Sequence, residues 1–307
     1  MSPVHFGDAL VQRIRSLGHP LCVGLDPHLP QIPALFRRGS MTQSDPQTAE
    51  AVQAFCMAML DRVAGKTAVI KPQIALFEQL GPAGFEALAR VNARARELDL
   101  LIIMDAKRGD IGSTAEGYAA AYLHPGAPFA SDALTVNPFM GLDTLQPYLD
   151  SLTDHGRGLF ALVKTSNPGS ASLQDVVVTD TPLYAHLANL LAPVSDRYRG
   201  PATGWSSLGA VVGATYPEQA QQLRERMPHT LFLIPGYGAQ GASARDAVRS
   251  FVPGPAGLEG GIVNASRAVL FPAQAASADS LRAWENAIDE SLSKSITDLG
   301  EAVSHSG

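Results

Sequence analysis

Leu101-Ile-Ile-Met-Asp105-Ala-Lys107-Arg-Gly-Asp110-Ile-Gly-Ser-Thr114 is an apolar run that leads directly into a cluster of charged residues. An unbroken apolar run ended by charge and glycine is typical of a strand buried on both faces, as in a parallel sheet. If the chain stays extended, the two-residue period of a strand puts Asp105 and Lys107 on the same side. Active sites of parallel α/β folds lie at this end of the strands. The stretch is therefore a candidate active site.

A cluster of solvated ion pairs in a loop is the alternative interpretation, because such clusters are common and weakly stabilising. The rest of the chain favours the first interpretation, because the pattern of strand and helix recurs. Apolar strands are predicted at 21–25, 67–71, 101–105, 133–136, 158–163, 208–213, 231–234 and 261–265. Helical spacing is present at 4–17, 48–64, 82–98, 115–122, 142–152, 182–198, 217–227, 244–251 and 279–292.

Eight strand–helix units in a chain of this length predict a single-domain (β/α)₈ TIM barrel over residues 1–293. A doubly wound open sheet is less favoured, because no strand is followed by a G-x-G-x-x-G turn and no composition break marks a second domain. Residues 168–181 and 199–207 are rich in Gly, Ser and Pro and are predicted to be loops or lids. Residues 294–307 are predicted to be a frayed tail.

The composition is that of an acidic globular protein. Of its 307 residues 46% are hydrophobic and 17% charged, with a net charge of −6, which argues against nucleic acid or an anionic membrane as a partner. Cys22 and Cys56 lack metal-ligand spacing, so free thiols in a reducing compartment are expected rather than a zinc site. No signal peptide and no apolar run of about 20 residues is recognisable. We therefore expect a cytoplasmic protein.

Polar residues follow nearly every predicted strand, and in a barrel these residues converge on one mouth. They are Asp26, Lys71, Asp105 with Lys107 and Asp110, Asn137, Thr165-Ser166-Asn167, the glycine-rich loop from Gly236 to Gly241, and Arg267. Neighbouring strands are about 4.8 Å apart, so Lys71 is expected beside Asp105. The result is an alternating Lys-Asp-Lys-Asp array. A lysine that merely reaches past the barrel rim to solvent is less favoured for Lys71, because it directly ends an apolar strand.

The ends of the seventh and eighth strands are the usual phosphate site of such barrels. Gly236, Gly238 and Gly241 expose backbone N–H groups that can bind an anion, and Gln240 and Arg267 add side-chain donors. A surface salt bridge is the alternative role for Arg267. The combination of a glycine loop and an arginine at the next strand end favours phosphate.

Several of these motifs, in this order, resemble the orotidine 5′-phosphate decarboxylase family. The most specific is Asp105-x-Lys107-x-x-Asp110-Ile-Gly-x-Thr114, with Lys71 ending the preceding strand. The longer bacterial (type 2) subgroup is the most similar, through Lys71-Pro-Gln-Ile-Ala-Leu-Phe-Glu, Thr135-Val-Asn-Pro-Phe-Met-Gly, Thr165-Ser-Asn-Pro and Pro235-Gly-Tyr-Gly-Ala-Gln-Gly. The likeness extends over residues 21–271.

The resemblance implies decarboxylation of orotidine 5′-phosphate to UMP, the last step of de novo pyrimidine nucleotide synthesis, without metal or organic cofactor. It implies that Asp105 lies against the substrate carboxylate and that Lys107 protonates C6. Further implied roles are ribose binding by Lys71, Asp110 and Asp26, pyrimidine binding by Ser166 with Asn167 beside it, and phosphate binding by Tyr237, Gln240 and Arg267 with Gly236 and Gly238. It also implies a homodimer in which Asp110 and Thr114 reach into the partner's site.

Two other functions remain open. A Mg²⁺-dependent sugar-phosphate lyase, such as the hexulose-phosphate synthases, resembles this fold and shares the Asp-x-Lys-x-x-Asp element. Lys71 disfavours it, because a second cation would oppose a metal. A catalytically silent phosphosugar-binding barrel would be supported by the loss of one member of the charged array, and none is lost.

Overall fold

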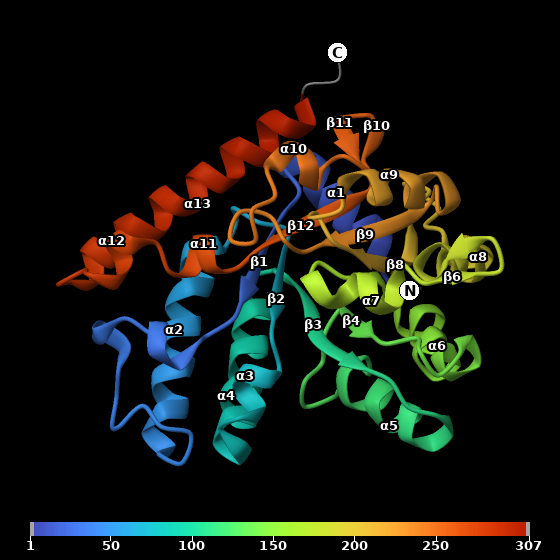
Figure 1. Cartoon of the computed structure of the whole chain (residues 1–307). Helices are drawn as coiled ribbons and strands as arrows, with labels where there is room; N and C mark the ends of the chain where they lie inside the picture. The colour runs from blue at the N-terminus through green and yellow to red at the C-terminus, as the bar shows by residue number, and fades with distance from the viewer. Residues whose placement is uncertain (1–2, 305–307) are drawn as a thin grey trace.

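Eight parallel strands close into a barrel surrounded by helices (Figure 1). The structure is a computed structural model and describes residues 3–304. Around the barrel the order is β1-β12-β9-β8-β5-β4-β3-β2, and β1 pairs with both β12 and β2. The predicted single-domain (β/α)₈ barrel is confirmed. Its strands are β1 (Leu21–Leu25), β2 (Val69–Pro72), β3 (Leu101–Arg108), β4 (Ala133–Val136), β5 (Gly158–Lys164), β8 (Ser206–Val212), β9 (Thr230–Ile234) and β12 (Gly261–Ala265).

The helices form the outer layer, except for the first. They are α1 (Phe6–Leu17), α2 (Pro46–Val63), α3 (Ala75–Glu78), α4 (Gly81–Glu97), α5 (Gly112–Tyr122), α6 (Gln146–His155), α7 (Ala171–Gln174), α8 (Leu183–Ser195), α9 (Pro217–Arg226), α10 (Ala244–Ala247), α11 (Arg267–Leu270), α12 (Ala273–Ala276) and α13 (Leu281–Ser304). Short 3₁₀ turns are η1 (Leu29–Gln31), η2 (Ala34–Phe36), η3 (Leu142–Leu145), η4 (Pro168–Ser170) and η5 (Asp196–Tyr198).

Two apolar clusters make up the core. The larger one lies between the strands and the outer helices. The smaller one fills the barrel interior and includes Phe6 and Leu10 of α1. Phe6 packs edge-to-face on Phe160 of β5, with ring centroids 6.1 Å apart. Helix α1 packs into this inner cluster and closes the barrel at the amino ends of the strands. Within the described residues the carboxyl ends have no such cover, and the barrel opens there into a cavity.

The structure corrects the prediction of a frayed tail for residues 294–304. Helix α13 continues to Ser304, and Leu292, Leu299 and Val303 on one face of it are buried. These residues recur at helical spacing, so burial of an apolar stripe holds the helix in place. The remaining predicted tail, 305–307, lies outside the described residues.

Two other segments differ from prediction. The helix expected over 244–251 ends at Ala247, and the chain then enters a hairpin of β10 (Val252–Gly254) and β11 (Gly257–Glu259). The carbonyl of Ser250 accepts a hydrogen bond from Arg224 instead of continuing the helix. The loop expected over 168–181 contains η4, α7 and a hairpin of β6 (Val177–Val178) and β7 (Thr181–Pro182). Within residues 3–304, no helix combines the length and apolarity needed to cross a membrane.

Candidate active site

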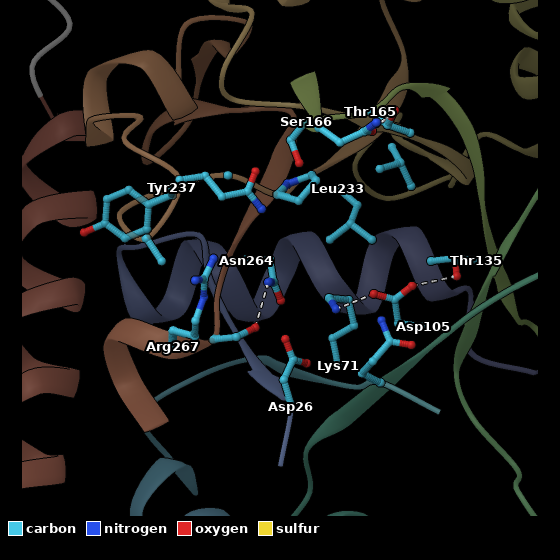
Figure 2. Close-up of a pocket in the computed structure, with 18 of the residues that line it drawn as sticks. Asp26, Lys71, Asp105, Thr135, Thr165, Ser166, Leu233, Tyr237, Asn264 and Arg267 are labelled. Atoms are coloured by element: carbon cyan, nitrogen blue, oxygen red, sulfur yellow. Dashed lines mark hydrogen bonds and ion pairs between the residues drawn. The ribbon is translucent and has the colours of Figure 1, made fainter. Parts of the chain in front are cut away.

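A cavity of about 840 Å³ opens at the carboxyl ends of the barrel strands. Figure 2 shows its lining, with helix α1 crossing behind it. Most of the strand-end residues predicted from the sequence line this cavity, but Asp110, Asn137, Gly238 and Gly241 do not. The cavity is lined by Asp26, Lys71, Asp105, Lys107, Thr165, Ser166, Asn167, Gly236, Tyr237, Gln240 and Arg267.

Asp105 is bridged by two lysines from two strands. Lys71 Nζ, at the end of β2, lies 2.5 Å from Asp105 Oδ2, as predicted from the neighbouring strands. Lys107 Nζ lies 2.5 Å from Asp105 Oδ1. The side chains of Lys71 and Asp105 are only 5% and 9% exposed, whereas that of Lys107 is 46% exposed. The inner pair is therefore fixed, and Lys107 faces the space that a substrate would occupy.

Charge pairing keeps this array ionised despite its burial. Burial acts to raise the pKa of Asp105, but the charges of Lys71 and Lys107 outweigh it and hold that pKa well below its usual range. Burial likewise acts to lower the pKa of Lys71, and the charges of Asp105 and Asp26 outweigh it, so the pKa lies above its ordinary value. The carboxylate and the buried ammonium are both charged at neutral pH.

A bulge in β3, rather than a regularly extended strand, presents Lys107. The pairing of β3 with β4 shifts register between Met104 and Arg108, and Lys107 has φ +48°. Thr135 of β4 supports the bulge, because its Oγ1 accepts the backbone N–H groups of Ala106 (3.0 Å) and Lys107 (2.9 Å). The same hydroxyl donates to Asp105 Oδ1 at 3.1 Å. Thr135 is not among the site residues predicted from the sequence, although a hydroxyl in an otherwise apolar strand marks it.

Asp26 and the neighbouring end of β12 leave polar atoms free for a ligand. Asp26 Oδ1 is buried and, among the described residues, has no hydrogen-bond partner. Asn264, also missed from the sequence, lines the cavity and donates from Nδ2 to Ser266 Oγ at 3.2 Å. Gly24 lies beside them, and a Cβ there would lie 2.0 Å from Ser266 Oγ and displace that hydroxyl. A buried carboxylate oxygen without a donor is suited to bind a ligand hydroxyl.

The glycine-rich loop and Arg267 lie together at the opposite side of the cavity from Asp105 (Figure 2). Gly236 and Gly238 have φ of +108° and +70°, backbone conformations that glycine adopts readily. Gly238 lines an adjoining cavity rather than this one. Tyr237 lines the cavity at the strand ends, but its hydroxyl donates to Asp298 of α13 at 2.6 Å. The loop therefore offers the cavity Gln240 and backbone groups, while the tyrosine hydroxyl is occupied elsewhere.

A sequence model described as the orotidine 5′-phosphate decarboxylase / HUMPS family matches residues 19–280 of this chain. The chain belongs to this family. A relative from Rhodopirellula baltica named orotidine 5′-phosphate decarboxylase is 44% identical over 270 residues, which cover 87% of this chain and 88% of the relative. One of the same name from Deinococcus radiodurans is 41% identical over 271 residues, covering 88% and 90%. The structure of Leishmania donovani OMP decarboxylase superposes with a TM-score of 0.73 at 29% identity, covering 98% of each chain.

Two residues of the family motif do not reach the cavity of their own chain. Asp110 follows Gly109 at the outer rim, and its Oδ1 accepts the backbone N–H of Ile111 at 2.8 Å. Thr114 is exposed and lines a separate surface depression with Arg108. Within one described chain, the charged array therefore consists of Lys71, Asp105 and Lys107, without the predicted fourth member.

Proposed function

We propose that this protein decarboxylates orotidine 5′-phosphate to UMP and CO₂, the last step of de novo pyrimidine nucleotide synthesis. The observation that carries the proposal is the Lys71–Asp105–Lys107 array at the mouth of a barrel of this family. Decarboxylation leaves an electron pair on C6 of a ring that has no adjacent electron sink, so a preorganised cation is needed there. Lys107 is such a cation, and it is the array member most exposed to the cavity.

Lys107 also supplies the proton. When the bond between C6 and the carboxylate breaks, its electron pair stays on C6 and takes a proton from Lys107 Nζ, leaving a neutral amine. Asp105 orients this ammonium, because its Oδ1 accepts a hydrogen bond of 2.5 Å from Lys107 Nζ. Thr135 fixes the bulge from which Lys107 projects. We assign Asp105 the position beside the substrate carboxylate.

The other ligand groups are bound by the residues around this array. Asp26, through its unpartnered Oδ1, and Lys71 bind ribose hydroxyls. Ser166 lies across the cavity from Lys71 (Figure 2). Together with Asn167, which also lines the cavity, it binds the pyrimidine. Gln240, Arg267 and the loop N–H groups bind the phosphate. Binding energy from this remote phosphate can then be used to position the ring at Lys107.

We further propose a homodimer with shared active sites. Asp110 and Thr114 belong to the family motif, but they do not line the cavity of their own chain. Large apolar side chains near them support this proposal. Ile111 is 61% exposed, and Phe139 and Met140 after the neighbouring β4 are 77% and 47% exposed. A two-fold axis at this face would cover apolar surface and carry Asp110 into the partner's cavity.

Mixing two inactive homodimers tests the shared site. Lys71→Ala and Asp110→Ala subunits are combined under conditions that exchange subunits, with exchange confirmed by mass spectrometry of tagged chains. Random pairing makes about half of the dimers mixed, and one site of each mixed dimer is intact, so roughly a quarter of wild-type activity should return. Activity that stays at the level of the parents would show that Asp110 serves its own chain.

The family to which this chain belongs includes HUMPS proteins besides the decarboxylases, so a metal-dependent sugar-phosphate lyase is the second candidate. Lys71 opposes it, because its ammonium lies where a cation bound to Asp105 would have to sit. Among residues 3–304, no three His, Cys, Asp or Glu side chains are grouped as a metal site. The ion pair, rather than this absence, is our reason for preferring the decarboxylase.

The deciding experiment follows the absorbance of the orotate ring after orotidine 5′-phosphate is added to protein treated with EDTA. Loss of absorbance with formation of UMP is expected. No conversion of orotidine 5′-phosphate, together with Mg²⁺-dependent cleavage of a hexulose phosphate, would favour the lyase. UMP binding without turnover of either substrate would favour a silent binding barrel. We also propose a cytoplasmic location without nucleic-acid or membrane partners, supported by the negative charge and by two buried free cysteines.

A further inference from the structure

Helix α13 contacts both segments that carry the proposed phosphate-binding residues. Asp298 accepts a hydrogen bond of 2.6 Å from the hydroxyl of Tyr237, in the loop that contains Gln240. Two turns earlier, the Ser291 hydroxyl donates one of 2.6 Å to the carbonyl of Ala268, the residue after Arg267. Ser291 and Asp298 are seven residues apart and so lie on one face of the helix. The family model ends at residue 280, and α13 begins at Leu281.

Tyr237 is suited to anchor the loop. It stands between Gly236 and Gly238, whose positive φ values give the backbone on either side unusual freedom. Tyr237 lines both the catalytic cavity and a second cavity of about 530 Å³, which residues of α13 also line. Burial and the hydrogen bond to Asp298 raise the pKa of Tyr237 well above its ordinary value, so the phenol stays protonated and donates. A side chain that is fixed between two flexible positions restrains the whole turn.

The helix that holds this anchor is itself firmly seated. Trp284, Ile288, Leu292 and Leu299 are fully buried along one side of α13. Farther from the loop, Asp289 pairs with Lys66 after α2 at 2.8 Å. A loop tied to such a helix loses little further conformational freedom when a ligand binds.

We propose that Tyr237 and Asp298 are positioning residues, through which α13 holds the loop from Gly236 to Gly241 so that Gln240 and Arg267 face one phosphate site before substrate arrives. This inference rests on the proposed function. It makes a helix outside the matched family region part of the substrate-binding apparatus, although none of its residues lines the catalytic cavity. The alternative, that α13 only stabilises the fold, predicts equal effects on substrates with and without phosphate.

The test compares orotidine 5′-phosphate with orotidine, which lacks the phosphate. Tyr237→Phe and Asp298→Ala should each lower kcat/KM for orotidine 5′-phosphate about fivefold, the size expected for loss of one hydrogen bond, and leave kcat/KM for orotidine unchanged. Asp298→Asn should retain most of the activity, because an amide oxygen still accepts. The double variant should be no worse than either single one. Asp289→Ala removes an α13 ion pair remote from the loop and is the matched control.

Equal losses with both substrates, or no loss in either anchor variant, would overturn the inference. Thermal unfolding of each variant checks that the helix is still seated. Calorimetry with UMP and uridine gives a readout independent of turnover: weaker binding of UMP but not of uridine supports the anchor, and equal changes refute it. Failure of the wild-type protein to convert orotidine 5′-phosphate would instead refute the proposed function, and the calorimetry would still decide on the anchor.

Discussion

Buried charges lie at both ends of this barrel, but they are neutralised in different ways. At the carboxyl end, Lys71 and Asp105 pair with each other beside an open cavity. At the amino end, Arg224 of α9 is 6% exposed and has no carboxylate partner within the described chain. Burial of a charge therefore does not by itself mark an active site. What marks it is a charge whose remaining hydrogen-bonding capacity faces open space.

Arg224 is enclosed by backbone carbonyls and aromatic rings. Its guanidinium donates to the carbonyl oxygens of Ser250, Met227, Pro228, Thr230 and Gly260 at 2.7–3.3 Å. Its Cζ lies 5.0 Å from the ring centre of Trp205 and 3.9 Å from that of Phe232. Burial lowers its pKa to about 9, which leaves it charged at neutral pH. Because these donors are used within the protein, Arg224 joins the segments before β9, β10 and β12 and has little capacity left for a ligand.

The largest expected effect is a loss of activity on substitution of Lys107 at the carboxyl end of the barrel. Lys107→Ala removes both the proton donor and the cation beside C6, so kcat should fall by about 10⁴-fold or more, the upper range for loss of a general acid. Stability should change little, because Lys107 is half-exposed and Asp105 keeps Lys71. Initial rates and thermal unfolding measure the two effects. Lys66→Ala, which removes a lysine paired with Asp289 outside the site, is the control. Near-normal turnover in Lys107→Ala would refute the assigned mechanism.

The opposite outcome is expected at the amino end. Arg224→Met leaves several buried carbonyls without donors, so the free energy of unfolding should fall by about 3–5 kcal/mol. The folded fraction should keep near-wild-type kcat, because Arg224 lies at the other end of the strands from the cavity. Urea unfolding and rates per folded molecule test this. Arg226→Ala changes an arginine of the same helix whose Nη1 donates to Asn189 in an exposed contact and should cost little. A large loss of kcat without a loss of stability would contradict the claim that Arg224 stabilises the fold and takes no part in catalysis.

The two ends also differ in how far the sequence predicts them. Lys71 and Asp105 each end an apolar strand, so strand position alone places them at one mouth, and the structure confirms their contact. Arg224 lies in a polar helix, where local pattern does not distinguish it from Arg226. Its burial depends on carbonyls such as that of Gly260, 36 residues away in sequence. The two-residue period of a strand predicts the side to which each of its side chains points. Backbone carbonyls from distant segments that enclose an arginine leave no pattern in the sequence around that arginine.

Several features near the site also depend on contacts between distant elements and so have little local signal in the sequence. Asp298 falls in a segment predicted to fray, because its small polar residues obscure the apolar spacing of Leu292, Leu299 and Val303. The two-residue period of a strand correctly predicts that Lys107 lies beside Asp105. It does not predict the backbone there, because β3 bulges at Lys107 instead of staying regularly extended. Asp110 and Thr114 belong to the family motif, and the role proposed for them needs a second chain. Patterns along the chain locate side chains at strand ends, and the contacts that orient them come from other elements.

An intermediate effect is expected at the phosphate side of the mouth. Arg267→Ala and Gln240→Ala should each raise KM and lower kcat/KM for orotidine 5′-phosphate more than about tenfold, since a charge-assisted contact to phosphate contributes about 1.5–3 kcal/mol. Stability should stay close to wild type, because Gln240 is exposed and Arg267 begins the short helix α11. Arg249→Ala, which changes an arginine that does not line the cavity, is the control. Wild-type kinetics in both variants would place the phosphate elsewhere.

The smallest effect is expected at Thr135, a residue at the carboxyl end of the barrel that contributes to both stability and activity. Thr135→Val keeps the shape of the side chain but removes the hydroxyl that accepts from Ala106 and Lys107 and donates to Asp105. Loss of these buried contacts should lower the free energy of unfolding by about 1–2 kcal/mol. Because the bulge that presents Lys107 is then less fixed, kcat should also fall by several-fold, with KM little changed.

Thr144→Val is the matched control for this last prediction. Thr144 is also buried and donates to the Gly141 carbonyl at 2.6 Å, but it does not line the cavity. It should lose stability without a loss of kcat. If Thr135→Val and Thr144→Val behave alike, Thr135 only stabilises the strand, and the position of Lys107 depends on its ion pair with Asp105. If Thr135→Val alone lowers kcat, the hydroxyl orients the proton donor, and stability and chemistry at this end of the barrel share one residue.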